Sequence, residues 1–593
     1  MENPYEKYDA HRNEPRYGHG AAWGFTLVFL LVITLAPFWQ NVNEAALGSN
    51  GWTPVIEIFR YSPDQGPLTE HLRQAEKKIE DAPFTKPPRR WMQALLTGTL
   101  REGNRQAAIG SDGWLFFRPA IDALTGYGPL KPEPDTVAKD PNREPWRGPL
   151  DAIVRFNAQL ESYGVELILV PIPVKPMIHP EQIGARSGEA PLQHRDAEAF
   201  YAKLRESGVE ILDLSADWFA RKGTEPVFLK QDTHWTPQTM QASAGRVADF
   251  LRKRPWFTQI TTEAGRFALG APVTVTAPGD LLEKLDLPDG NGAFEPETAT
   301  ITPVTDTKGG AMSVYDPASP IVLLGDSFTN IFHQADMKWG ENAGFAEHLS
   351  HALGLPLDTI AQNGQASTGV RRTLATRADA ERLMREKKKA VVWAIAARDL
   401  FLSETAAVTN GVRWDDVNFR TGDPAKDVRW PVELEATVTE TARYQDPKSA
   451  PYDASLFAVE YRVDRVLSGD YALDQVLALH WAFRNRTLTP DASLKPGDQV
   501  RLTLEAFEQA STSDETLRGA NKATGTTHEF DLPMAWASGV HRLTGARGET
   551  AAAASADQAS RLASIATGIF GLGLGLVLWL VFRHKRALRA ARN

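Results

Sequence analysis

Short apolar runs alternate with helical patterns between residues 150 and 400. Apolar residues recur at helical spacing in segments such as 150–163 and 240–251. Short, continuous apolar runs are typical of strands buried on both faces of a sheet. Their alternation with helices predicts a parallel α/β sheet. The five candidate strands lie at residues 165–170, 209–214, 321–324, 357–361 and 390–395.

Two segments within this region predict particular local structures. Residues 262–319 show no clear periodicity, so we expect an elaborate loop there. Residues 371–389 are rich in charged side chains and predict one long helix.

The pattern changes to short alternating strands beyond residue 405. Turn residues, among them Pro490-Asp491 and Pro496-Gly497-Asp498, separate the strands, and no long helix interrupts them. We therefore predict an all-β module of barrel or sandwich type over residues 405–508. The Ala-, Thr- and Ser-rich residues 509–561 predict a linker.

Two apolar stretches, residues 21–39 and 562–582, are each long enough to cross a bilayer. Basic residues precede the first and follow the second, which predicts a cytoplasmic tail at 1–20 and a basic cytoplasmic tail at 583–593. Two transmembrane helices then place a helical lead-in (40–104) and the main domains outside the cytoplasm. In a Gram-negative bacterium that is the periplasmic side of the inner membrane. A cleaved signal peptide is the alternative for the first stretch.

Composition excludes several classes of function. The formal charge of -9, from 65 basic and 74 acidic residues, and the lack of a basic stripe before the C-terminus argue against nucleic-acid binding. The chain has no cysteine, which excludes thiol nucleophiles, thiolate metal sites and disulfides. The histidines show no ligand spacing and no phosphate-cradling glycine loop is present, so we expect neither a metal nor a cofactor.

The tetrapeptide Gly-Asp-Ser-Phe, residues 325–328, follows one of the buried strands directly. A serine at the carboxyl end of such a strand lies where open α/β sheets place their active sites. The N–H groups of the next turn would face a ligand there. The alternative is an ordinary strand-to-helix turn in which the Asp or Ser caps the helix.

A second candidate lies in the loop before the helix that Thr236 and Pro237 are expected to start. There Asp232 can reach back to one imidazole nitrogen of His234 and leave the other free. A serine nucleophile requires that arrangement in its base. The alternative is that both residues are exposed loop residues.

Three motifs in this order carry a family likeness: Gly113-Trp114-Leu115-Phe116, Asp232-Thr233-His234-Trp235 and Gly325-Asp326-Ser327-Phe328. They resemble the SGNH-hydrolase-like domain of periplasmic alginate O-acetyltransferases over residues 105–404. The resemblance implies a flavodoxin-like three-layer fold and a Ser-His-Asp triad. It further implies acetyl transfer onto an exported polysaccharide and a membrane-bound O-acyltransferase that delivers acetyl.

Carried over by residue, the resemblance makes Ser327 the nucleophile, His234 the base and Asp232 its orienting partner. It assigns the Ser327 backbone N–H as one oxyanion donor, and Gly364 fits the position of the second family glycine. Asn363, beside Gly364, is a further candidate for an oxyanion donor. Arg398 is a candidate for contact with an anionic sugar, and the alternative is that it forms a structural salt bridge.

Three functions are compatible with these observations. The first is a polysaccharide O-acetyltransferase. The second is a periplasmic carbohydrate acetylesterase, in which water takes the place of the sugar. The third is a membrane-tethered polysaccharide-binding scaffold with a relic triad.

Overall fold

The computed structural model describes residues 86–131 and 148–543 apart from short internal gaps, together with residues 68, 71 and 72. The gaps are at 289, 291, 310–311, 424–425, 427, 446, 448–449, 451 and 529–531. No helix within the described residues is long and apolar enough to span a membrane. The two predicted spans, 21–39 and 562–582, the two tails and most of the lead-in lie outside the described residues.

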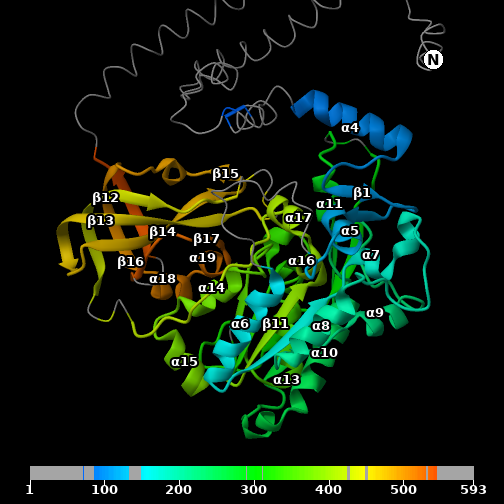
Figure 1. The fold of residues 1–593 in the computed structure, drawn as a ribbon, viewed down its shortest axis with the longest axis horizontal. Coiled ribbons are helices and arrows are strands. Elements are labelled where there is room, and N and C mark those ends of the chain that lie inside the picture. The colour runs from blue at the N-terminus through cyan, green and yellow to red at the C-terminus, as the bar shows by residue number, and fades with distance from the viewer. Residues whose placement is uncertain are drawn as a thin grey trace, which may run out of the picture. The chain divides into compact units, whose positions relative to one another are not determined.

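A five-stranded parallel sheet forms the centre of the α/β domain (Figure 1). This confirms the predicted parallel α/β sheet, although the second strand is shorter than expected. The strands are β3 (Glu166–Ile172), β4 (Glu210–Ile211), β9 (Ile321–Gly325), β10 (Asp358–Ala361) and β11 (Ala390–Ala396).

The spatial order of this sheet is β10-β9-β11-β3-β4. The strands can be numbered from β9, so that β9, β10 and β11 are 1, 2 and 3, and β3 and β4 are 4 and 5. With this numbering the spatial order reads 2-1-3-4-5, which is the order of flavodoxin-like sheets. The strand order therefore changes direction at β9, which lies between β10 and β11 in the sheet. Ligands of open α/β sheets bind outside the carboxyl ends of the strands at such a switch point.

Helices cover both faces of the sheet because its strands alternate two sets of apolar side chains. Ile321 and Leu323 pack in one core with helices α10 (Pro237–Arg252) and α13 (Phe345–Leu353). Val322 and Leu324 point to the opposite core. The helices of that second core are α6 (Pro149–Ser162), α8 (Ala197–Glu206), α14 (Gly369–Ala375) and α15 (Ala380–Lys387).

Two local predictions for this domain are wrong. The single helix expected at 371–389 is two helices, α14 and α15, and Asp379 between them has a φ of 49°, which no α-helix accommodates. The segment 262–319 is not a structureless loop. It contains β5 (Phe267–Leu269), β6 (Val273–Ala277), α11 (Asp280–Lys284), β7 (Glu297–Ile301) and β8 (Val304–Asp306).

The C-terminal β module is a closed barrel, which confirms the barrel alternative of the prediction. Its strands pair in the order β14-β18-β16-β12-β13, and β13 pairs back to β14. Only the β14–β18 pair among these is parallel. Numbered along the chain, this is the closed order 1-2-3-5-4-1, the topology of the five-stranded OB-fold barrel. The strands are β12 (Arg429–Thr441), β13 (Ser455–Asp470), β14 (Gln475–Arg484), β16 (Gln499–Ala506) and β18 (Met534–Arg542).

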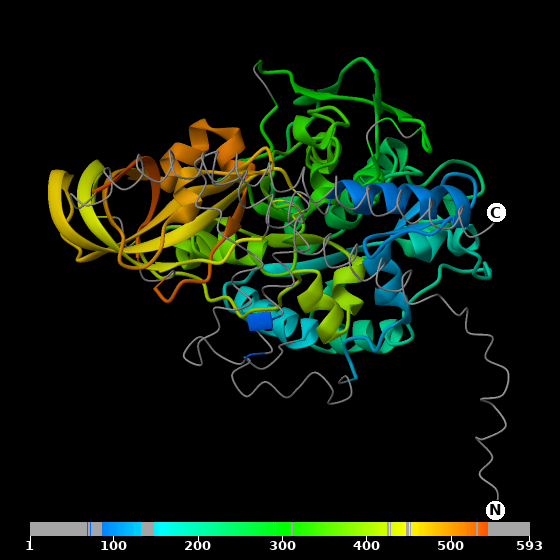
Figure 2. The same cartoon turned by 90° about the horizontal axis from the view of Figure 1, so that it is seen from above.

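The expected boundary at residue 508 is wrong, because the module extends to Arg542. Helix α18 (Phe507–Ser513) crosses this boundary into the predicted linker. Helix α19 (Glu515–Gly519), strand β17 (Asn521–Ala523) and β18 lie within that linker. Without β18 the barrel could not close, since β18 joins β14 to β16. In Figure 2 the barrel strands form a group apart from the central sheet.

The remaining α-helices and strands are short, apart from one helix of 15 residues before the domain. They are α4 (Lys86–Leu100), β1 (Ala107–Ile109), β2 (Leu115–Phe117), α5 (Arg118–Thr125), α7 (Lys175–Ile178), α9 (Ser215–Arg221), α12 (Ser327–Asn330), α16 (Ala397–Phe401), α17 (Glu404–Thr409) and β15 (Thr487–Leu488).

Candidate active site

Ser327 is the first residue of α12, directly after β9. The preceding Asp326 caps this helix, because its Oδ1 accepts the Phe328 N–H at 2.9 Å. Its Oδ2 accepts the Ala396 N–H, at 3.2 Å, from the neighbouring strand β11. Asp326 thus anchors the turn to the sheet, and Ser327 stands at the switch point.

His234 lies in the loop before α10, as expected. Thr236 caps α10 and Pro237 is its first residue, in agreement with the sequence. The His234 ring meets the Phe328 ring at 4.7 Å between centroids, so the two motifs pack together. Asp232 and His234 are 1% and 2% exposed, so the alternative of exposed loop residues is wrong.

The three predicted site residues form one continuous hydrogen-bonded chain. His234 Nδ1 lies 2.6 Å from Asp232 Oδ1, and His234 Nε2 lies 2.8 Å from Ser327 Oγ. Ser327 is 93 residues from His234 in the chain, and the fold alone brings them together. A carboxylate on Nδ1 keeps the proton there and leaves Nε2 as a base toward the hydroxyl.

Asp232 accepts N–H groups on both of its oxygens. Oδ1 also takes the backbone N–H of His234 at 3.1 Å. Oδ2 takes the backbone N–H of Asp280 at 3.0 Å and the indole N–H of Trp339 at 2.9 Å. Burial alone raises the pKa of Asp232, but His234 and these donors outweigh it and hold the pKa well below its usual range.

Gly279 permits the close approach that brings the Asp280 N–H to Asp232. A Cβ at this position would lie 2.1 Å from the Gln231 carbonyl oxygen and 2.6 Å from the Asp232 nitrogen. Both are backbone atoms of the loop that carries the carboxylate, so no side-chain movement could relieve the clash.

The Gly113–Phe116 motif supports the same loop through Lys175. Buried Lys175 donates to the backbone oxygens of Leu115 at 2.8 Å, Lys230 at 3.0 Å and Asp232 at 2.5 Å. Its ammonium also lies 5.5 Å from the Trp114 ring centre. Burial lowers the pKa of Lys175 to about 8, and nearby carboxylates oppose the shift.

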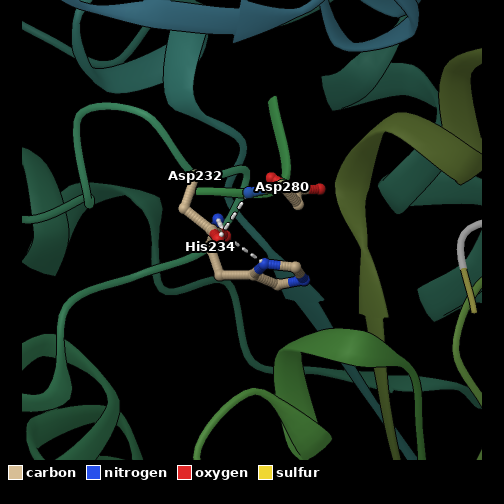
Figure 3. A group of neighbouring side chains, drawn as sticks. All are labelled: Asp232, His234 and Asp280. Carbon is tan, nitrogen blue, oxygen red and sulfur yellow. Dashed lines mark hydrogen bonds and ion pairs between the residues drawn. The ribbon is translucent and has the colours of Figure 1, made fainter. Parts of the chain in front are cut away.

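Asp232, His234 and Asp280 also form the one cluster of potential metal ligands among the described residues (Figure 3). Their donor atoms are already engaged, however. The Asp280 carboxylate accepts the Thr233 N–H at 2.7 Å and the Lys284 ammonium at 2.9 Å. A cation would have to displace these bonds beside a lysine, so the group fits a hydrogen-bonded network better than a metal site.

The other three predicted residues come shortly after the two strands that flank β9. Asn363 and Gly364 follow β10, and Gly364 has a left-handed φ of 70°. The Asn363 Oδ1 accepts an N–H of Asn330 at 2.8 Å, which ties this turn to α12. Arg398 follows β11. No hydrogen bond joins any of the three to Ser327 within the described part of the chain.

Arg398 forms the structural salt bridge that the sequence left as an alternative. Its Nε lies 3.3 Å from Asp399 Oδ1, while its buried Nη1 has no partner among the described residues. Burial raises the pKa of Asp399 to about 6, with Arg398 opposing the shift and Asp326 adding to it.

Trp339, Asp280 and Lys175 were not predicted as site residues. They contact the Asp232 loop from segments 107, 48 and 57 residues away in the chain. A single tryptophan in a loop or a lysine at a strand end carries no local signal of such a contact.

Several known proteins are similar to this chain. Residues 107–397 match the model of the SGNH hydrolase-like domain, acetyltransferase AlgX. A protein of Pseudomonas aeruginosa named probable alginate O-acetylase AlgJ is 28% identical over 337 residues, covering 54% of this chain and 78% of that protein. The protein of the same name from Pseudomonas fluorescens is 26% identical over 277 residues.

Residues 107–397 form an SGNH hydrolase-like domain of the alginate O-acetyltransferase-like family. The description of this family model names an acetyltransferase, and both relatives are named as probable alginate O-acetylases. The alignment covers 45% of this chain and 61% of the Pseudomonas fluorescens relative. Among solved structures, the O-acetyltransferase domain of Pseudomonas putida AlgJ is 22% identical, with a TM-score of 0.37, covering 50% of this chain and 92% of that domain.

Proposed function

We propose that the protein transfers acetyl groups onto hydroxyls of an exopolysaccharide through Ser327, His234 and Asp232. The observation that carries this proposal is the buried chain of contacts, 2.6 Å from Asp232 to His234 and 2.8 Å from His234 to Ser327. It supplies a nucleophile, a base and an orienting carboxylate in hydrogen-bond reach of one another.

In the first half-reaction, Ser327 Oγ attacks the carbonyl carbon of an acetyl donor, and His234 Nε2 takes the hydroxyl proton. The imidazolium then returns this proton to the leaving group as the donor's bond breaks, which leaves acetyl-Ser327. In the second half-reaction, a sugar hydroxyl attacks the acetyl carbon and gives its proton to Nε2. That proton passes to Ser327 Oγ when the acetyl-sugar leaves.

For the oxyanion of each tetrahedral intermediate we propose the backbone N–H groups of Ser327 and Gly364 as donors. The position of Gly364, in the turn that Asn363 ties to α12, supports this assignment. Arg398, whose Nη1 lacks a partner among the described residues, is proposed to face an anionic sugar. Removing one oxyanion donor typically costs about 10²–10³ in rate.

The names of the relatives, which concern alginate, support an alginate-like polymer as acceptor. We further propose that a membrane-bound O-acyltransferase supplies the acetyl group. The proposed location is the inner membrane, with the main domains in the periplasm and both termini in the cytoplasm. The predicted spans at 21–39 and 562–582 support this topology.

The test incubates the full chain with 4-nitrophenyl acetate and oligosaccharide acceptors and follows acetylated sugar by mass spectrometry. We expect acetyl-sugar from the wild type and none from Ser327→Ala. The matched control is Ser313→Ala, which replaces an exposed serine whose hydroxyl bonds to the Tyr315 backbone, and this variant keeps activity. Release of free acetate at the same rate with and without acceptor would favour an acetylesterase, and activity in Ser327→Ala would refute both enzymes.

A further inference from the structure

A cavity of about 270 Å³ lies between the edge strand β10 and the β16–β18 connection of the barrel. Neither Ser327, His234 nor Asp232 is among its described lining residues. Thr329 and Asn330 of α12 form part of one wall, so the cavity adjoins the helix that carries Ser327. Its volume suits a small molecule, just below the range of drug-sized ligand pockets.

The lining is cationic. Its described charged side chains are five cations and two carboxylates, namely Arg372, Arg377, Arg420, Arg518 and Lys522 against Asp423 and Glu508. Carboxylates outside the lining hold two of the arginines. Asp358 binds Arg377 at 2.7 Å and 2.9 Å, and Asp415 contacts Arg372 at 3.3 Å.

Lys522 differs from Arg377 and Arg372, because no carboxylate among the described residues binds it. Its ammonium lies 4.8 Å from the centre of the Phe507 ring. Within the described part of the chain it has neither a hydrogen-bond acceptor nor an ion-pair partner. By its exposed surface Lys522 is partly buried. A partly desolvated cation without a partner is costly, and an anion in the cavity would reduce that cost.

The position of the cavity in the barrel points to a ligand independently of charge. Phe507, Arg518 and Lys522 all belong to the connection between β16 and β18, the fourth and fifth barrel strands. This connection is one of the two loops with which OB-folds contact their ligands. The cationic wall therefore lies where this barrel topology commonly binds.

We propose that this cavity binds a small anion that carries a carboxylate or a phosphate group, with its charged end against Lys522. The Phe507 and Tyr315 rings offer apolar surface to the rest of the molecule. This site is separate from the triad and does not depend on the proposed reaction.

Proton uptake gives the proposal a specific signature. Burial lowers the pKa of Lys522 to about 7, Arg377 adds to this shift and Glu508 opposes it. Arg518 and Tyr315 also line the cavity from other segments. At pH 8 the side chain is largely neutral, and a bound anion would favour its protonated form. Binding is therefore accompanied by uptake of up to about one proton at Lys522.

The experiment measures thermal unfolding and calorimetric binding of the full chain with sodium phosphate or sodium glucuronate, against sodium chloride of equal ionic strength. We expect at least one anion, at ten times its Kd, to raise the Tm by about 1–2 °C. Calorimetry at pH 8 in two buffers of different ionisation enthalpy reports the proton uptake. The two arms distinguish a phosphate from a carboxylate ligand.

Lys522→Met, which keeps a side chain of similar length, should weaken binding at least about tenfold and abolish proton uptake. It should leave ester hydrolysis unchanged. Lys495→Met, an exposed lysine of the same barrel, is the matched control and should bind like the wild type. Ser327→Ala should also bind, which separates this site from the proposed function. No Tm rise beyond that in chloride, or equal binding and proton uptake in Lys522→Met, would overturn the proposal.

Discussion

Replacing Asp232 by asparagine tests the catalytic proposal most sharply, because the structure predicts which way the new amide turns. Each carboxylate oxygen accepts two N–H groups: Oδ1 those of His234, Oδ2 those of Asp280 and Trp339. An asparagine must present an NH₂ group to one of these pairs. The backbone and indole N–H groups cannot become acceptors, whereas the His234 ring can, by changing its tautomer.

We therefore expect the Asn oxygen to face Trp339 and Asp280 and its NH₂ group to face His234 Nδ1. The ring proton then moves to Nε2, where it points at Ser327 Oγ and blocks its deprotonation. A change of tautomer of this kind lowers kcat by about 10⁴ in a serine protease triad, and we expect a loss of about 10³–10⁴ here. The unpaired His234 backbone N–H should destabilise the fold by about 1–3 kcal/mol.

The assay follows 4-nitrophenyl acetate cleavage and the acetyl-enzyme by intact mass spectrometry. Asp280→Asn is the control, since the Asp280 carboxylate binds Thr233 and Lys284 rather than His234. This variant should stay within about tenfold of the wild-type rate. If Asp232→Asn keeps more than about a tenth of that rate, the assigned tautomer or the role of His234 is incorrect.

Three further changes test the surroundings of the triad. Trp339→Phe removes one donor from a carboxylate whose pKa is held low, so it should lower stability at pH 7 by about 1.5–3 kcal/mol. This contribution to stability is present above the unfolded pKa of about 4 and is lost in acid. The difference in Tm between the wild type and Trp339→Phe should therefore shrink well below pH 4, and an undiminished difference would contradict the prediction. Near pH 4 the free energy of unfolding of Asp399→Asn should equal that of the wild type. At pH 8 it should be higher than that of the wild type by up to about 3 kcal/mol. The reason is that the pKa of the Asp399 carboxyl is raised to about 6, so the wild type loses stability as the pH rises through that value. If urea unfolding gave the same pH profile for the wild type and the variant, this account would be refuted. Gly279→Ala should displace the Asp232 loop and lower kcat by at least about 10², whereas unchanged kinetics would show that the loop relaxes freely.

The sequence predicted the triad residues because each one stands at a locally marked position. Ser327 follows an apolar strand, and His234 precedes a helix with a threonine cap and a proline. Their roles came from the family resemblance, and the fold places their side chains in contact. The module boundary failed for a physical reason: β18 is stabilised by pairing with β14 and β16, and its Ala- and Ser-containing sequence has little strand character of its own.

Local periodicity and turn chemistry thus determined the strands of the sheet, the helix starts and the serine at a strand end, because these depend on near neighbours in the chain. Tertiary structure alone decided how the carboxylate of Asp232 is satisfied, since Trp339 and Asp280 reach it from distant segments. It also decided the order of strands around β9 and the closure of the barrel. Hydrogen bonds and packing between distant residues depend on how the whole chain is arranged, and no short stretch of sequence contains that information.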